Sequence, residues 1–257
     1  MLQELRLFLT AIQFFTRIPV PARVGHSAQQ LEQAARYLPL VGICVGALCS
    51  AVLYFGAQLL PLALAVGLSI AAGILVTGAF HEDGLSDFAD GMGGGHNKEK
   101  ALAIMKDSRV GAYGVITIVL VLLLKYQALL ALCGTQSLLF AAAALIAAHA
   151  FSRLMAASIM LTQRYVRDDD SARAKPAAQA LSHTSFAIAL FIGIVPLGMM
   201  FIATPHQVLA AVAAALLMRI YLAWRLQKRL GGYTGDCLGA VQQLSELAFY
   251  LGLLAAL

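Results

Sequence analysis

The chain has 257 residues, of which 60% are hydrophobic and 12% are charged, and its formal net charge is +5. Soluble domains are about 45–50% apolar and about 25% charged, so this composition excludes an ordinary soluble protein and predicts an integral membrane protein. In a membrane protein a basic excess reflects topology and anionic headgroups, so we expect a lipid bilayer and no nucleic acid as partner.

The first segment, residues 1–21, carries Glu4, Arg6 and Arg17 within an otherwise apolar pattern. A helix with charges placed in this way suits the membrane surface, where one face is buried and the other is wet. We therefore expect an N-terminal amphipathic or re-entrant helix before the first membrane span.

Seven segments meet the requirement of about 20 mostly apolar residues for a membrane-spanning helix. They are residues 37–60, 62–80, 110–133, 137–161, 185–204, 206–224 and 238–257. The sequence thus predicts an all-α, polytopic membrane bundle of about seven transmembrane helices in addition to the N-terminal helix. We expect residues 1–257 to form a single membrane-embedded domain.

Basic residues gather in alternate connections of this bundle. The N-terminal segment and the connections after the second, fourth and sixth spans contain Lys and Arg, whereas the other connections contain none. Cytoplasmic loops collect Lys and Arg, so the N-terminus is predicted to lie in the cytoplasm. The polar clusters at residues 81–109, 163–170 and 231–236 then all lie on the cytoplasmic side.

The most acidic stretch follows the second span. Asp83, Asp87 and Asp90 stand at positions i, i+4 and i+7, so in a helix their carboxylates share one stripe. Carboxylates in one stripe repel unless cations lie between them, and hard oxygen ligands favour Mg²⁺, with Mn²⁺ as the alternative. The simpler interpretation, a solvated polar loop between two membrane helices, stays open at this point.

Neighbouring residues provide the other groups that metal-assisted phosphoryl transfer requires. Glu82 and Asp107 are further candidate metal ligands, and His81 is a candidate general base or only a helix cap. The candidate phosphate-binding cations are Lys106, Arg109, Arg153, Arg164 and Arg167. The sequence contains no GxxxxGK[ST], GxSxG or HExxH motif, so P-loop ATPases, serine hydrolases and zinc proteases have no support.

Several ionisable residues fall within the predicted spans, where burial is costly and usually functional. Arg153 is expected to reach the site, and Arg219 either to reach it or to extend toward the membrane surface. Lys125 and Glu246 lie near the middles of their spans and are expected to pair across the bundle in a structural role.

Two motifs resemble the cobalamin synthase family, also called adenosylcobinamide-GDP ribazoletransferases. They are FHEDGLSDFADG at residues 80–91 and IMKDSRVGAYG at residues 104–114. The segments FTRIPVP (15–21), YLPLVG (37–42) and GYTGDCLGA (232–240) also agree, so the resemblance extends over essentially the whole chain. The family pattern varies at position 82, where leucine is common.

The resemblance implies a late step of vitamin B12 assembly in the bacterial inner membrane, at an active site that faces the cytoplasm. The cobinamide phosphate of adenosylcobinamide-GDP would pass to α-ribazole or its 5′-phosphate, with release of GMP and a requirement for Mg²⁺. It also implies that Asp83, Asp87 and Asp90 are functional, and extends a role to Asp107, Arg109, Arg153 and Asp236.

Two other functions remain to be weighed. The CDP-alcohol phosphotransferases have an Asp-x-x-Asp-Gly-x-x-Ala-Arg core, which Asp87, Asp90 and Gly91 imitate, but Gly94 and Gly95 stand in place of Ala-Arg. A cation-coupled transporter would carry its polar site near the middle of the membrane, whereas this acidic stretch lies at the end of a span.

Overall fold

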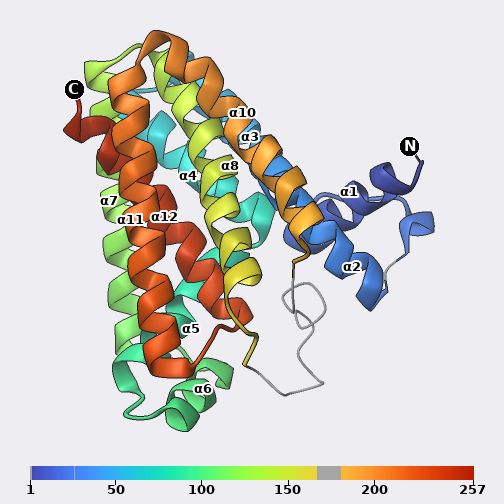
Figure 1. The fold of residues 1–257 in the computed structure, drawn as a ribbon. Coiled ribbons are helices and arrows are strands. Elements are labelled where there is room, and N and C mark those ends of the chain that lie inside the picture. Colours follow the sequence, from blue (N-terminus) through green and yellow to red (C-terminus); the bar gives the residue numbers. More distant parts are fainter. Residues whose placement is uncertain (1, 26, 167–180) are drawn as a thin grey trace.

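The computed structural model describes residues 2–25, 27–166 and 181–257. Within these ranges the secondary structure is helical, apart from one isolated bridge between Tyr165 and Tyr233. The helices are α1 (Leu2–Phe15), α2 (Ala28–Ala34), α3 (Leu38–Leu59), α4 (Leu62–Thr77), α5 (Phe80–Gly94), α6 (Lys98–Lys106), α7 (Ala112–Thr135), α8 (Leu138–Thr162), α10 (His183–Ala203), α11 (Pro205–Leu230) and α12 (Gly235–Ala255). Figure 1 shows them as one bundle with α1 and α2 at its side.

In the described part of the chain, six helices are long and apolar enough to cross a membrane. The count becomes seven if α4 and α5, which are bent by 88° at a short break, form one broken span. The prediction of a polytopic all-α membrane protein is confirmed, and the expected N-terminal amphipathic helix is α1. Its residues Leu7, Ala11 and Phe15 are buried, whereas Leu5 is exposed.

The second predicted span, residues 62–80, is not one straight helix in the structure. Its 16-residue helix α4 ends at Thr77, and at 1.5 Å per residue it reaches only about 24 Å, less than the ~30 Å of a bilayer core. Gly78 and Ala79 then adopt left-handed conformations, with φ of 65° and 59°. The chain therefore turns sharply before α5, although the apolar pattern runs on through this point.

Small residues allow the central helices to approach closely. A side chain at Gly46 of α3 would place its Cβ 2.7 Å from Ile146 Cα of α8, and one at Gly252 of α12 would lie 2.6 Å from Ala211 Cα of α11. In membranes such contacts replace the hydrophobic effect, because lipid tails are as apolar as the helices themselves.

The polar connections lie at one end of the bundle. Figure 1 shows α5, α6, the end of α8 and the turn between α11 and α12 at the lower end, and the α7–α8 and α10–α11 turns at the upper end. The predicted separation of polar from apolar connections is therefore present in the structure.

The contact between α3 and α8 gives a first prediction. Gly46→Ala should lower the free energy of unfolding by about 1–3 kcal/mol, because the new methyl group meets the α8 backbone. Thermal unfolding in detergent measures this change. Gly198→Ala is the matched control: it is also within a membrane helix, but no atom lies within 4 Å of its added Cβ. Equal stability of the two variants would contradict the packing described here.

Candidate active site

The break between α4 and α5 is packed by the chain that follows α1. The backbone N–H of Arg17 donates to the carbonyl of Val76 at 2.6 Å. The Arg17 side chain lies directly over Gly78, where a Cβ would collide with its guanidinium. Glycine is favoured at position 78 because of its left-handed conformation, and a side chain there would also displace the Arg17 guanidinium. The FTRIPVP segment therefore helps to set the direction in which α5 leaves the bundle.

Two glycines bring α5 against the start of α12. A Cβ at Gly84 would lie 3.2 Å from Asp236 Cα, and one at Gly239 would lie 2.9 Å from the carbonyl oxygen of His81. The two backbones are therefore almost in contact. This close packing places Asp236, in the first turn of α12, beside the first turns of α5.

The predicted acidic stripe lies on α5, but its three members have different surroundings. Asp83 is exposed, Asp87 is half-buried and Asp90 is buried. Asp90 accepts hydrogen bonds from the backbone N–H groups of Gly111 at 2.7 Å and Gly114 at 2.9 Å. These groups belong to the first turn of α7, whose positive dipole end favours a carboxylate. Asp90 therefore anchors α7 to α5, a role that sequence reasoning missed.

No group of three or more His, Cys, Asp or Glu side chains is arranged to hold a metal ion within the described residues. A complete metal site made by the three aspartates therefore stays a prediction. The residues do fit a less complete one, because Mg²⁺ is commonly bound by one or two carboxylates together with water and substrate phosphates. Asp83 and Asp87 are the accessible members of the stripe.

Asp107 has a partner of its own. Its carboxylate accepts from the Arg109 guanidinium, with 2.6 Å between Asp107 Oδ2 and Arg109 Nη2, and from the Arg109 backbone N–H at 3.1 Å. These hydrogen bonds lower the pKa of Asp107 to about 2. Both side chains are on the α6–α7 connection and are exposed to solvent. The carboxylate is thus occupied locally, and its predicted metal contact remains untested.

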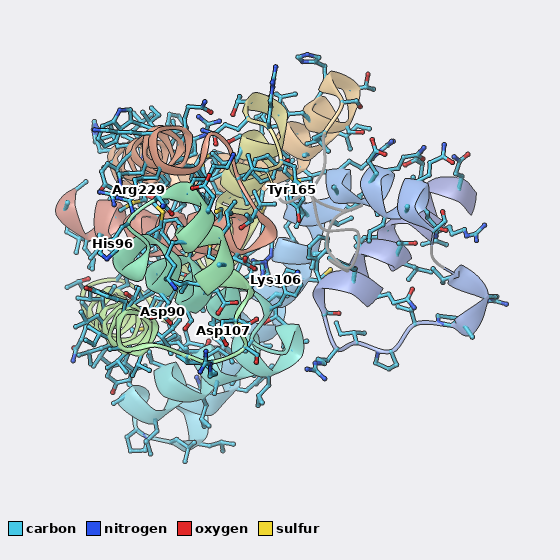
Figure 2. The ribbon with its side chains drawn as sticks, turned by 90° about the horizontal axis from the view of Figure 1, so that it is seen from below. Asp90, His96, Lys106, Asp107, Tyr165 and Arg229 are labelled. Atoms are coloured by element: carbon cyan, nitrogen blue, oxygen red, sulfur yellow. The ribbon has the colours of Figure 1, made fainter. Side chains whose placement is uncertain are left out.

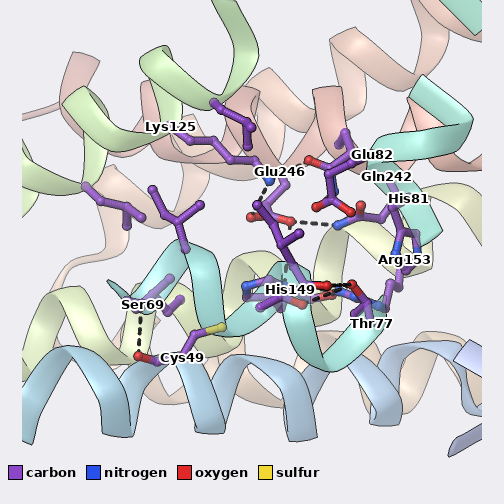
Figure 3. Close-up of a pocket in the computed structure, with 17 residues that line it drawn as sticks. Cys49, Ser69, Thr77, His81, Glu82, Lys125, His149, Arg153, Gln242 and Glu246 are labelled. Atoms are coloured by element: carbon purple, nitrogen blue, oxygen red, sulfur yellow. Dashed lines mark hydrogen bonds and ion pairs between the residues drawn. The ribbon is translucent and has the colours of Figure 1, made fainter. Parts of the chain in front are cut away.

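Glu82 turns away from the stripe and into the bundle. Its Oε1 accepts from the Gln243 side chain at 2.8 Å, while the Gln243 amide oxygen accepts from Lys125 at 2.7 Å. Lys125 pairs with Glu246 at 2.9 Å, which confirms the predicted pairing across the bundle. Figure 3 shows Glu82, Lys125 and Glu246 around one cavity.

Glu82, Lys125, Gln243 and Glu246 belong to one buried cluster, which His149 and Arg153 of α8 and Gln242 of α12 complete. The Arg153 side chain contacts His149 Nδ1 at 3.1 Å and donates to the His149 carbonyl at 3.0 Å, and it is only 1% exposed. Gln242 donates to Glu246 at 2.6 Å. His81 and Arg153 also line a second, apolar cavity beside Phe14. Each cavity has a volume of about 30 Å³, far too small for a nucleotide.

Sequence reasoning missed Gln242 and Gln243. The available signal was a polar run within an otherwise apolar span, formed by Gln242, Gln243, Ser245 and Glu246. On a helix this run faces α5, α7 and α8 rather than lipid, as its burial shows.

The predicted phosphate-binding cations do not all gather in one place. Figure 2 looks onto the polar end of the bundle, where Lys106 and Asp107 lie at the end of α6. Arg164 is exposed after α8, Arg153 is buried inside the bundle, and Arg167 lies outside the described residues. Arg219 does not join the buried cluster; it donates to Ser158 Oγ at 2.8 Å and to Thr162 Oγ1 at 2.6 Å, and so extends along α8 toward its exposed last residue.

A backbone bridge joins the chain after α8 to the turn before α12. The N–H of Val166 donates to the Tyr233 carbonyl, and the N–H of Tyr233 donates to the Arg164 carbonyl, both at 2.9 Å. A Cβ at Gly232 would collide with the Arg164 carbonyl oxygen. The GYTGD segment thus ties Arg164 to the start of α12, close to Asp236.

Comparison with known proteins gives one family. The protein-family model described as cobalamin-5-phosphate synthase matches residues 7–254 of this chain. This range includes α5, its acidic stripe and the whole of the buried cluster. No solved structure matches the chain.

Curated relatives carry a consistent name. The protein of Shewanella frigidimarina named adenosylcobinamide-GDP ribazoletransferase is 46% identical over 257 residues, covering 99% of this chain and 96% of the relative. The protein of the same name from Vibrio cholerae is 44% identical over 255 residues, covering 99% and 95%. That from Leptothrix cholodnii is 46% identical over 265 residues, covering 99% and 97%.

The contacts of Asp90 give a second prediction. Asp90→Ala should lower the free energy of unfolding by about 2–3 kcal/mol in the absence of metal, because two amides of α7 lose their acceptor. Thermal unfolding in excess EDTA measures this. Asp83→Ala, at the exposed end of the same stripe, is the control and should leave stability unchanged. An Asp90→Ala variant as stable as the control would show that the hydrogen bonds between Asp90 and the α7 amides contribute nothing to stability.

Proposed function

Because this chain belongs to the cobalamin-5-phosphate synthase family, we propose that it transfers the cobinamide phosphate of adenosylcobinamide-GDP to α-ribazole or to α-ribazole 5′-phosphate. A ribose hydroxyl oxygen of the riboside forms the new bond to phosphorus, the diphosphate bond to the nucleotide breaks, GMP leaves and the hydroxyl proton is released. The observation that carries this proposal is the match over nearly the full chain, at 42–46% identity to relatives of one name.

In this proposal Asp83 and Asp87 hold Mg²⁺ at the polar end of the bundle, with Mn²⁺ as the alternative. The metal, when bound, neutralises charge on the diphosphate as it is cleaved. Asp83 is exposed and Asp87 half-buried, so both can meet a ligand that arrives from the aqueous side. Asp90 supports them indirectly, because it fixes α5 against α7.

The substrates are too large for the buried cavities, so we place them on the polar end of the bundle. Ligand pockets for small molecules are about 300–1,000 Å³, and the two cavities beside α5 are about 30 Å³ each. Lys106, Arg109 and Arg164 are exposed at this end and suit phosphate oxygens. Asp236 lies beside α5 in the same region. His81 remains the proposed general base; it lines both cavities, and Glu82 and Asp83 follow it directly in the chain.

The chain is a multi-pass membrane protein, and we place it in the bacterial inner membrane with its active site facing the cytoplasm. The basic connections support this orientation. The names of the relatives favour this enzyme over a CDP-alcohol phosphotransferase. A transporter is disfavoured because the acidic stripe ends at the polar end of the bundle rather than in a central cavity.

The activity can be tested directly. The purified protein in lipid, given adenosylcobinamide-GDP, α-ribazole and Mg²⁺, should release GMP and form a cobalamin product, and EDTA should stop both. Asp87→Ala should reduce kcat by about 100-fold or more, since several kcal/mol of charge stabilisation are lost. Lys228→Gln, an exposed change on α11, is the control. Full activity of Asp87→Ala, or turnover only with CDP-diacylglycerol and an alcohol, would reject the proposal.

The orientation is tested separately, in a variant whose four native cysteines are replaced. His96→Cys lies between α5 and α6, and Thr135→Cys lies at the opposite end of α7; both positions are exposed. In intact spheroplasts an impermeant maleimide should label Thr135→Cys, and should label His96→Cys only after permeabilisation. The reverse pattern would place the site outside the cytoplasm.

A further inference from the structure

The buried cluster contains two cations and two carboxylates, but only one direct ion pair joins them. Lys125 and Glu246 are 5% and 2% exposed and lie 2.9 Å apart. Arg153 is fully buried and makes no direct ion pair with any carboxylate among the described residues. A buried charge without a counter-ion is strongly destabilising, so the surroundings must supply one.

Glu82 is the remaining carboxylate at this cavity, which Arg153 also lines. Glu82 Oε1 is bonded to Gln243, whereas Glu82 Oε2 has no hydrogen-bond partner within the described parts of the chain. The same is true of two other buried atoms, Arg153 Nε and Gln242 Oε1. Figure 3 shows that the three side chains come from α5, α8 and α12 and converge on one space.

The space has the size and polarity that water needs. Its volume is about 30 Å³. One buried water requires a cavity of about 10–15 Å³ and two to four polar partners. A water molecule can accept from Arg153 Nε–H and donate to Glu82 Oε2 and Gln242 Oε1. The three orphaned atoms, one donor and two acceptors, therefore match the bonding capacity of water.

We propose that one or two ordered water molecules in this cavity join Glu82 to Arg153 as a hydrated ion pair that links α5 to α8. The two pairs, Lys125 with Glu246 and Arg153 with Glu82, then leave the cluster without net charge. A metal cation in the cavity would instead stand beside two positive side chains, which like-charge repulsion disfavours.

This pair makes Glu82 a positioning residue rather than a metal ligand. With Glu82 held inward by Gln243 and by water, α5 is fixed about its own axis. Asp83 and Asp87 then face away from the buried cluster, because they stand on a different face of the helix from Glu82. The catalytic consequence rests on the proposed function, whereas the ion pair itself does not.

Stability measurements test the pair without any assay of activity. Glu82→Gln and Arg153→Gln should each lower the thermal unfolding midpoint in detergent by about 10 °C, because each leaves one buried charge unpaired. The double variant should be more stable than either single variant, since no unpaired charge remains. If the two losses add in the double variant, the proposal is overturned.

A control cycle uses the other arginine of the spans. Arg219→Gln removes a guanidinium that bonds to α8 hydroxyls away from the cavity, so its loss should add to that of Glu82→Gln. If Arg153→Gln alone does not fold, the double variant still decides: a folded double variant supports the pair, and an unfolded one overturns it.

Metal dependence distinguishes positioning from ligation. Glu82→Gln should lower kcat while the Mg²⁺ concentration for half-maximal rate stays within about twofold of wild type, whereas Asp87→Asn should raise that concentration at least tenfold. A comparable rise in Glu82→Gln would make Glu82 a metal ligand and overturn the positioning role. Absence of turnover in the wild-type protein would reject the proposed function and leave the stability result standing.

Discussion

The near-contact between the backbones of α5 and α12 is the constraint on which the rest of this structure depends. Gly84 and Gly239 permit it, and no larger residue fits at either position without displacing the opposite helix. Through this contact a short polar helix is held at the end of an apolar bundle. One face of α5 then joins the buried cluster, while the next face meets the aqueous side.

The buried cluster shows how a membrane protein tolerates many polar groups in one place. Lys125 of α7, Glu82 of α5 and the α12 residues Gln242, Gln243 and Glu246 satisfy one another across three helices, so few of their polar atoms are left without partners. The bilayer core contains no water that could form hydrogen bonds with an unpaired polar group. Such a network therefore favours the one arrangement of helices in which its polar groups are paired. The same network gives the polar end of the bundle a rigid support, which the proposed site for phosphoryl transfer would need.

Much of the fold followed from the sequence because hydropathy and charge placement report directly on the bilayer. The pairing of Lys125 with Glu246 was also predictable, since opposite charges inside spans need each other. The break at Gly78 and Ala79 was not, because the apolar pattern continues across it and only backbone conformation and the packing of Arg17 reveal it. Helical spacing predicted the stripe of Asp83, Asp87 and Asp90, but spacing cannot tell which carboxylate meets solvent and which meets the amides of α7.

The hydrogen bonds from the first turn of α7 to Asp90 have a consequence for the protein in its ligand-free state. Three bare carboxylates on one helix would push apart, but two backbone amides already shield the innermost of them. Only the charges of Asp83 and Asp87 are left to repel each other, and water can screen them because Asp83 is exposed and Asp87 is half-buried. The chain can therefore be inserted and fold without a metal ion, and under the proposed function a divalent ion would arrive together with the diphosphate and leave with the products.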